Sequence, residues 1–264
     1  MRISIILTFS FLSVLFAQTQ LGSDIDGEAA YDYSGYSVSL DSDGDRVAIG
    51  ARANDGTASS AGHVRIYEYS NSSWSQLGSD IDGEAEDDES GYSVSLDSDG
   101  DRVAIGARLN DGTANDAGHV RIYEYSNSSW SQLGSDIDGE AADDHSGWSV
   151  SLDSDGDRVA IGAHYNDGTG YAAGHVRIYE YSNSSWSQLG SDIDGEAAYD
   201  YSGHSVSLDS DGDRVAIGAY DNDGTASNAG HVRIYGIDTT APSAPAGLAA
   251  AASYGGAKLS WTAN

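Results

Sequence analysis

Carboxylate side chains recur at short, fixed spacing along this chain, and clustered carboxylate oxygens are the ligands that a hard cation such as calcium prefers. Each of four Asp-Ser-Asp-Gly-Asp stretches offers three carboxylates. The spacing departs from that of an EF-hand loop, because the glycine stands at the fourth position and no acid occupies the twelfth. Two interpretations remain open, bound calcium and solvated turn carboxylates. The residues concerned are Asp41, Asp43, Asp45, Asp97, Asp99, Asp101, Asp153, Asp155, Asp157, Asp209, Asp211 and Asp213.

Aromatic, imidazole and guanidinium side chains form a second set of candidates. They occupy positions at which four otherwise matching stretches of the chain differ from one another. Such side chains combine rigid contact area with a polar tip, which is typical of recognition surfaces. Drift in loops that contribute little to packing is the alternative. The candidate ligand-binding residues are Tyr31, Tyr33, Tyr36, Arg52, Tyr92, Arg108, His145, Trp148, His164, Tyr165, Tyr199, Tyr201, His204 and Tyr220.

The remaining polar residues do not indicate an enzyme. The chain contains no G-x-S-x-G, H-E-x-x-H or phosphate-binding Gly-Lys motif, and it has no cysteine that could act as a nucleophile. Its carboxylate pairs repeat four times, which indicates structure and not one asymmetric catalytic centre. Four histidines, His63, His119, His175 and His231, share one repeat position, and we expect them to be structural. No cofactor other than calcium is expected.

A repeat of 56 residues organises these side chains. The phrase L-G-S-D-I-D-G-E-A begins at Leu21, Leu77, Leu133 and Leu189, and two further phrases recur at the same interval. A period of this length indicates a supersecondary unit that is stacked or arranged in a ring.

Each unit carries the pattern of four antiparallel strands. In the first unit, alternating apolar and small residues predict strands over 36–40, 46–51 and 63–67, followed by a fourth over 74–81. One face of the first two strands bears only Ser, Ala and Gly, so it must accept larger side chains from a neighbouring sheet. The predicted fold class is therefore all-β, a β-propeller of four four-stranded blades of 56 residues each.

The two ends of the repeat array predict closure. Residues 20–25 read as a fourth strand without a preceding three, and the array ends with three strands over 206–208, 214–218 and 231–235. We expect the N-terminal strand to pair with the last blade, which would close the ring and remove two exposed edges. An open stack, or self-association of copies into a larger ring, remains the alternative.

The repeated run from Ser-Gly through Asn-Asp-Gly-Thr to Ala-Gly-His-Val-Arg-Ile-Tyr resembles FG-GAP repeats, the blades of integrin α-chain β-propellers and of many bacterial surface proteins. Ser34-Gly35 stands where that family has Phe-Gly, Gly50-Ala51 matches its Gly-Ala, and Arg52 replaces its proline. The resemblance covers residues 20–235 and implies a propeller fold at the cell surface. It does not imply the identity of a ligand.

Segments outside the repeats predict the domain boundaries. Arg2, the apolar stretch 3–16 and Ala17 fit a cleavable secretory signal over 1–17, and the stretch is too short to span a membrane. The propeller then occupies 18–237. In 238–264, an Ala-Pro-rich stretch and Lys258-Leu-Ser-Trp261 resemble the start of a fibronectin type III domain; an Ala- and Gly-rich linker is the alternative.

Net charge narrows the partners. With 12 basic and 42 acidic residues the chain carries a net charge of −30, which excludes nucleic acid and anionic membranes as partners.

In an up-and-down blade both variable links emerge at one end of the ring and the invariant turns emerge at the other end. We therefore expect a secreted or cell-surface, non-catalytic binding or adhesion module that presents variable loops to an extracellular glycan or protein. A passive spacer in a larger surface protein, with or without calcium, is the alternative.

Overall fold

The computed structural model describes residues 18–237, 249–253 and 256–260. The predicted signal over 1–17 and most of the predicted linker, including Trp261, lie outside the described residues. The described parts of the chain contain no helix long and apolar enough to cross a membrane.

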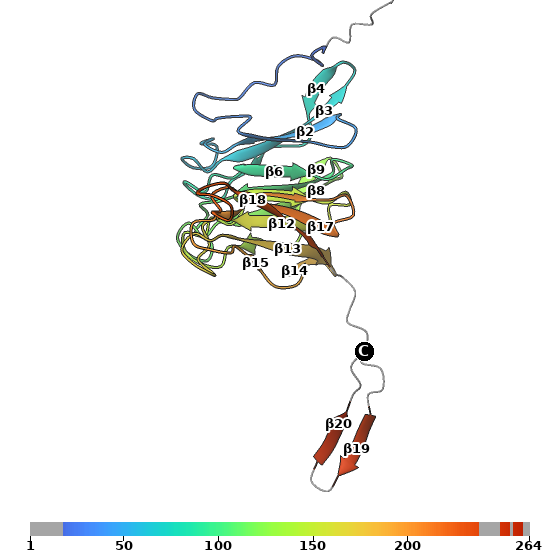
Figure 1. Ribbon diagram of the computed structural model, residues 1–264. Coiled ribbons are helices and arrows are strands. Elements are labelled where there is room, and N and C mark those ends of the chain that lie inside the picture. Colours follow the sequence, from blue (N-terminus) through green and yellow to red (C-terminus); the bar gives the residue numbers. More distant parts are fainter. Residues whose placement is uncertain (1–17, 238–248, 254–255, 261–264) are drawn as a thin grey trace, which may run out of the picture.

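Each of the first three repeats forms one antiparallel sheet in which two short outer strands share one edge (Figure 1). The first sheet contains β1 (Ser37–Leu40), β2 (Arg46–Ala51), β3 (His63–Ser70), β4 (Ser73–Gln76) and β5 (Ile81–Asp82). The second contains β6 (Ser93–Leu96), β7 (Arg102–Ala107), β8 (His119–Ser126), β9 (Ser129–Gln132) and β10 (Ile137–Asp138).

The third sheet repeats this arrangement, and the last sheet has only three strands. The third contains β11 (Ser149–Leu152), β12 (Arg158–Ala163), β13 (His175–Ser182), β14 (Ser185–Gln188) and β15 (Ile193–Asp194). The last contains β16 (Ser202–Leu208), β17 (Arg214–Ala219) and β18 (His231–Gly236). A separate hairpin pairs β19 (Ala249–Ser253) with β20 (Gly256–Ser260).

The expected fourth strand over 74–81 is broken in the structure. Its first part, β4, pairs with the C-terminal half of β3. Its last part, β5, pairs with the N-terminal end of β3, where Val64 lies opposite Ile81. Between them Gly78 has a φ of 79°, a left-handed conformation that interrupts a strand and that glycine tolerates best. The chain therefore leaves the strand for the four residues 77–80 and then rejoins the same edge of the sheet.

Neighbouring sheets pack face to face through one repeated contact. In the first contact, Ala48, Val64 and Ile66 of the first sheet enclose a core with Leu96 and Ile105 of the second. The same positions form the second and third contacts. A Cβ added to Gly50 would lie 2.1 Å from the carbonyl oxygen of Gly91, so the small face predicted from the sequence lets the sheets approach closely.

The innermost strands of the four sheets lie side by side around a common axis. Leu-Asp-Ser at the end of each innermost strand lines one shallow groove of about 220 Å³, to which all four sheets contribute. Backbone hydrogen bonds run along this groove from Ser42 to Ser98, from Ser98 to Ser154 and from Ser154 to Ser210. The all-β prediction and the four repeated sheets are thus confirmed, and the arrangement is consistent with propeller blades.

The predicted closure is not what the structure shows. Residues 20–25 form no strand, and the N-terminal segment lies on the first sheet, where Trp74 Nε1 donates to the Leu21 carbonyl at 2.9 Å. Val38 of the first sheet and Val232 of the last are 64% and 65% exposed, so neither end face is covered by the other. Because the repeats have nearly the same sequence, the open faces of the first and last sheets are complementary, but this similarity does not determine whether the two faces meet within one chain.

Candidate functional site

The two variable links of each repeat lie together and share an invariant support. The carboxylate of Asp144, which is 3% exposed, accepts hydrogen bonds from Asn166 Nδ2 at 3.0 Å and from the Ala141 backbone at 3.1 Å. The same aspartate–asparagine pair recurs in the other repeats. Because this support uses invariant residues, the positions around it can vary without loss of the loop geometry.

Two variable positions in each repeat adopt left-handed backbone conformations. Tyr31 and Tyr33 have φ values of 73° and 54°, and Tyr199 and Tyr201 have 67° and 53°. A bulky residue adopts this conformation at a cost of about 1–3 kcal/mol, and such strain persists only where surrounding contacts impose it. The links are therefore fixed structures and not unconstrained loops.

A column of rings runs across the four repeats at the start of the innermost strands. Tyr36 and Tyr92 have ring centroids 5.0 Å apart, Tyr92 and Trp148 4.7 Å, and Trp148 and His204 5.6 Å. These separations are those of favourable aromatic pairs. One variable position per repeat thus forms a continuous aromatic column.

A second row packs along this column. The guanidinium carbon of Arg52 lies 4.6 Å from the centroid of Tyr36, and that of Arg108 lies 4.5 Å from Tyr92. Glu89 forms ion pairs with both arginines, at 2.7 Å to Arg108. Both arginines are thereby engaged in cation–π and ionic contacts, which makes this half of the face charged but internally paired.

The half formed by the third and fourth repeats is aromatic and neutral. His164 lies 3.8 Å from Trp148 and 4.2 Å from Tyr165, ring centroid to centroid. Burial lowers the pKa of His164 to about 2 and that of His145 to about 4, so both imidazoles are uncharged at neutral pH. Tyr201 stacks on Tyr220 at 5.4 Å and meets Tyr165 edge-on at the same separation.

A cavity of about 450 Å³ opens beside this neutral half. Its walls combine aromatic rings with two carboxylates, those of Asp143 and Asp167. The other lining residues are Ala142, His145, Tyr165 and Tyr171. The volume lies within the range of small-ligand sites, and a few polar groups among aromatic walls are typical of them.

The structure brings together most of the residues chosen from the sequence. Those that join the ring column, the row beside it or the cavity are Tyr33, Tyr36, Arg52, Tyr92, Arg108, His145, Trp148, His164, Tyr165, Tyr201, His204 and Tyr220. Two lie apart: Tyr31 is 81% exposed, and Tyr199 contacts Tyr171 at 5.2 Å.

Sequence reasoning missed three contributors. Glu89, Asp143 and Tyr171 stand in the variable links, but their roles depend on neighbours from another repeat. The sequence did mark Glu89, because it is the only acid at its repeat position and because Arg52 and Arg108 occupy variable positions of the first two repeats.

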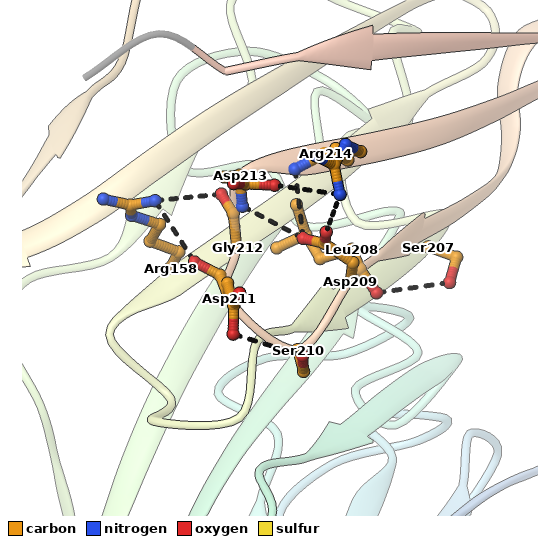
Figure 2. Close-up of polar contacts among 9 residues, drawn as sticks. All are labelled: Arg158, Ser207, Leu208, Asp209, Ser210, Asp211, Gly212, Asp213 and Arg214. Atoms are coloured by element: carbon orange, nitrogen blue, oxygen red, sulfur yellow. Dashed lines mark hydrogen bonds and ion pairs between the residues drawn. The ribbon is translucent and has the colours of Figure 1, made fainter. Parts of the chain in front are cut away.

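The Asp-Ser-Asp-Gly-Asp turns lie at the opposite end, around the shallow groove. Figure 2 shows the turn of the last repeat, where Asp209 Oδ1 accepts hydrogen bonds from the backbone nitrogens of Asp213 and Arg214, both at 3.0 Å. Arg158 from the preceding sheet donates to the Gly212 carbonyl at 3.0 Å. Turn oxygens that could serve a cation thus already accept protein donors. Calcium binding by these aspartates stays a prediction.

Groups with the composition of a cation site lie elsewhere among the described residues. Three equivalent groups, of which Glu84, His119 and Asp136 are one, place their ligand atoms within 4.8 Å of one another. Arg121 Nη1 lies 3.2 Å from Glu84 in that group, so a guanidinium already neutralises the carboxylate. Burial lowers the pKa of His119 to about 4, which agrees with the structural role expected for these histidines.

A fourth group of this kind, Asp116, Asp143 and His145, adjoins the cavity. Burial and the neighbouring carboxylates raise the pKa of Asp116. The cavity edge therefore concentrates negative charge beside a neutral imidazole, and its polar groups are chiefly acceptors.

Fold and site together define the class, an all-β repeat protein built from propeller-type blades with one variable face. A profile of the FG-GAP repeat family matches residues 136–179, which include β11, β12 and the first five residues of β13. The match does not extend to the C-terminal tail, and nothing supports the fibronectin type III resemblance. No curated protein matches the chain.

Three solved structures are similar to this chain at low sequence identity. A putative 6-phosphogluconolactonase from Bacteroides uniformis is 11% identical with a TM-score of 0.53, over 77% of this chain and 50% of the other. Saccharomyces cerevisiae Sqt1 is 14% identical (TM-score 0.48, 73% and 44%), and Kuenenia stuttgartiensis hydrazine synthase is 14% identical (TM-score 0.46, 76% and 58%). This chain thus spans about half the length of these proteins, and the likeness to the lactonase, at 11% identity, concerns the fold alone.

Proposed function

We propose that this protein is a non-catalytic extracellular module that binds a carbohydrate on its variable face. One observation carries the proposal: the positions at which the repeats differ converge on one aromatic surface with a cavity, whereas invariant residues build the support and the opposite end. Drift alone has no reason to place rings in contact across all four repeats.

The chemistry of the cavity favours a sugar. Tyr165, Tyr171 and His145 offer ring faces on which the apolar C–H side of a sugar can stack. Asp143 and Asp167 offer oxygens that accept hydrogen bonds from hydroxyl groups. The arginines of the other half share the carboxylate of Glu89 and stack on Tyr36 and Tyr92, so their guanidinium groups are already engaged within the protein.

A catalytic role has less support. The lactonase similarity extends only to the fold, and the cavity residues include no serine, threonine, cysteine or lysine that could act as a nucleophile. A protein ligand is the second candidate, because Tyr31 and Tyr33 stand exposed beyond the cavity. The extracellular location rests on the leader-like residues 1–17 and on the FG-GAP similarity.

The test is a panel of purified glycans, followed by calorimetry with any that bind. Tyr165→Ala and Tyr171→Ala should each weaken binding at least about tenfold, because each removes one stacking wall. The matched controls are Leu109→Ala and Asn115→Ala at the equivalent positions of the preceding repeat. They should leave binding unchanged.

Melting curves of the two control variants should match that of the parent within about 2 °C, whereas Tyr165→Ala and Tyr171→Ala should each melt a few degrees lower, because they lose ring contacts with His164, Tyr201 and Tyr199, and all four should unfold cooperatively. If no glycan binds, or if the controls weaken binding as much as the cavity variants, the carbohydrate proposal is wrong. Specific capture of a protein by Tyr31 and Tyr33 would then favour the second candidate, and the absence of both would favour a passive spacer.

A further inference from the structure

The first and last sheets leave opposite apolar faces open. On the last sheet Val232 and Ile234 are 65% and 71% exposed, whereas their counterparts Val64 and Ile66 in the first sheet are fully buried by the second sheet. On the first sheet Leu40 is 59% exposed, and its counterpart Leu96 is 7% exposed. Clustered apolar exposure of this kind marks a contact surface.

These two faces are the two halves of a contact that the chain already makes three times. The face with Val232 and Ile234 is equivalent to the face of Val64 and Ile66 that packs on the second sheet. The face of the first sheet that carries Leu40 is equivalent to the face of the second sheet that carries Leu96, and Val64 and Ile66 pack on the latter. The geometry of the internal contacts therefore predicts how the open faces fit together.

At the last sheet the polar groups of this contact are paired only within their own turn and strand: Arg214 pairs with Asp209 and Asp213, and Ser207 Oγ donates to the Leu208 carbonyl. Inside the chain, Ser39 Oγ accepts a hydrogen bond from the Leu96 backbone at 2.9 Å, and Arg46 donates to the Asp99 carbonyl at 3.1 Å. At the end of the array the equivalent arginine, Arg214, has a side chain that is 67% exposed. It is placed to reach the turn carbonyls of another first sheet.

The N-terminal segment carries the residues of the edge strand that the last sheet lacks. Inside the chain, Ile81 pairs with Val64 and the carbonyl of Leu77 accepts from a tryptophan of the next sheet at 2.7 Å. The equivalents of Ile81 and Leu77 at the N-terminus are Ile25 and Leu21, and the Leu21 carbonyl is already held by Trp74. This segment therefore lies where an edge strand for a preceding sheet belongs, although the structure contains no preceding sheet.

We propose that a second copy of this chain occupies these faces, with the last sheet of one copy packed on the first sheet of the next. Ile25 of the second copy would then pair with Val232 of the first, as Ile81 pairs with Val64 inside the chain. The contact is heterologous, so two copies can close into a ring of eight sheets or continue as a longer series.

Charge sets a condition on the association. Each copy carries −30, so copies repel one another at long range and the repulsion is screened by salt. Self-association should therefore strengthen as the sodium chloride concentration is raised, in contrast to an interface held by ion pairs.

The test is sedimentation velocity on the purified protein across concentration and salt, with one variant for each face. Ile234→Asp disables the last sheet and Leu40→Asp disables the first, and because both positions are exposed in the single chain, both variants should fold. Each should weaken self-association roughly a hundredfold, because a carboxylate would be buried without a partner.

Mixing the two variants is the decisive step. Each retains one intact face, so a mixture should form a dimer that goes no further, whereas each variant alone stays monomeric. Gly218→Ala is a third variant: the internal equivalents of Gly218 lie against a carbonyl of the following sheet, but Gly218 itself meets only Ser205.

Gly218→Ala should therefore fold and fail to associate. Closed dimers or longer series of the parent protein support the proposal equally, since both use the same contact. A parent that stays monomeric at high concentration and high salt, or a mixture that forms no dimer, overturns it. Monomers whose melting temperature falls with both Asp substitutions would show instead that the faces meet within one chain.

Discussion

Replacing a buried turn carboxylate by its amide should stabilise this protein. The turn of each following repeat covers the first aspartate of the turn before it, as where Gly156 approaches Asp97. Burial, together with the nearby Asp101, raises the pKa of Asp97 from its ordinary 3.8 to about 6, and Asp153 is raised to about 6 in the same way. The charged form is therefore penalised in the folded protein at neutral pH.

The sign and size follow from linkage. A folded-state pKa above the unfolded one contributes stability that is present below pH 3.8 and is lost as the pH rises through about 6. The difference corresponds to at most about 3 kcal/mol for Asp97 at pH 7.5. The turn borders solvent and Asp97 is coupled to Asp101, so we expect Asp97→Asn to recover about 1–1.5 kcal/mol, or about 2–6 °C in melting temperature.

The amide should also preserve the local geometry. Asp97 Oδ1 accepts a hydrogen bond from the Arg102 backbone at 3.0 Å, and the oxygen of an asparagine can accept the same bond. The assay is thermal unfolding of parent and variant from pH 4 to 8, with either calcium or a chelator present. The gain should be greatest above pH 7 and should disappear near pH 4.

Asp209→Asn is the matched control with the opposite expectation. Among the described residues no later turn covers Asp209; its slight burial acts to raise its pKa, but hydrogen bonds from Arg214 and Asp213 and the Arg214 charge outweigh this and lower it. Its amide should not stabilise the protein when measured at concentrations where the chain is monomeric. If Asp97→Asn melts below the parent at pH 7.5, and more so with calcium present, the carboxylate binds a cation and the desolvation argument is wrong.

Three further predictions follow from the same packing. Gly106→Ala should abolish cooperative folding in circular dichroism melts, because a Cβ would lie 2.1 Å from the Gly147 carbonyl; Gly218→Ala, at the same repeat position, should cost far less. Asp144→Ala should cost about 2–4 kcal/mol in urea unfolding, since it leaves buried donors unpaired, and an unchanged midpoint would contradict the support role. The free energy of unfolding of His119→Gln, measured relative to the parent, should rise as the pH drops from 6.5 towards 4, because burial lowers the pKa of His119 to about 4 and its unfolded form takes up a proton first, whereas the raised pKa values of Asp97 and Asp153 act in the opposite direction in both proteins alike; a difference between the two proteins that stays constant across this window would refute it.

Much of the fold could be predicted because the repeat is strict. Alternation at 36–40 and 46–51 places side chains on two faces, and the structure has β1 and β2 there as an antiparallel pair, with Val38 opposite Ile49. The requirement that Ser, Ala and Gly receive a neighbouring sheet also holds, as Gly50 shows. These features depend on local sequence and on contacts that every repeat makes alike.

Other features depend on information that a repeat does not contain. The break between β4 and β5 is marked only by Gly78 in a stretch that otherwise reads as a strand. Closure was predicted wrongly because Leu21 and Ile25 carry the same residues as Leu77 and Ile81, so sequence identity specifies the partner surface but not which copy provides it. At the site, Glu89 pairs with arginines from two repeats, a contact between units that no single repeat encodes.

Within each repeat, invariant residues support the links and other residues form the variable face, which explains why the sequence of that face could diversify. The invariant Asp144–Asn166 pair and the backbone hydrogen bond from Tyr201 to Ala172 hold the links in place without using any variable side chain. A change at a variable position therefore alters the surface at little cost to the fold, and the four repeats need not change together. The outcome is an asymmetric face on a repetitive scaffold, charged around Glu89 and neutral around His164. A ligand that contacts both halves can bind in one orientation only, so specificity would come from the order of the repeats as well as from any single residue.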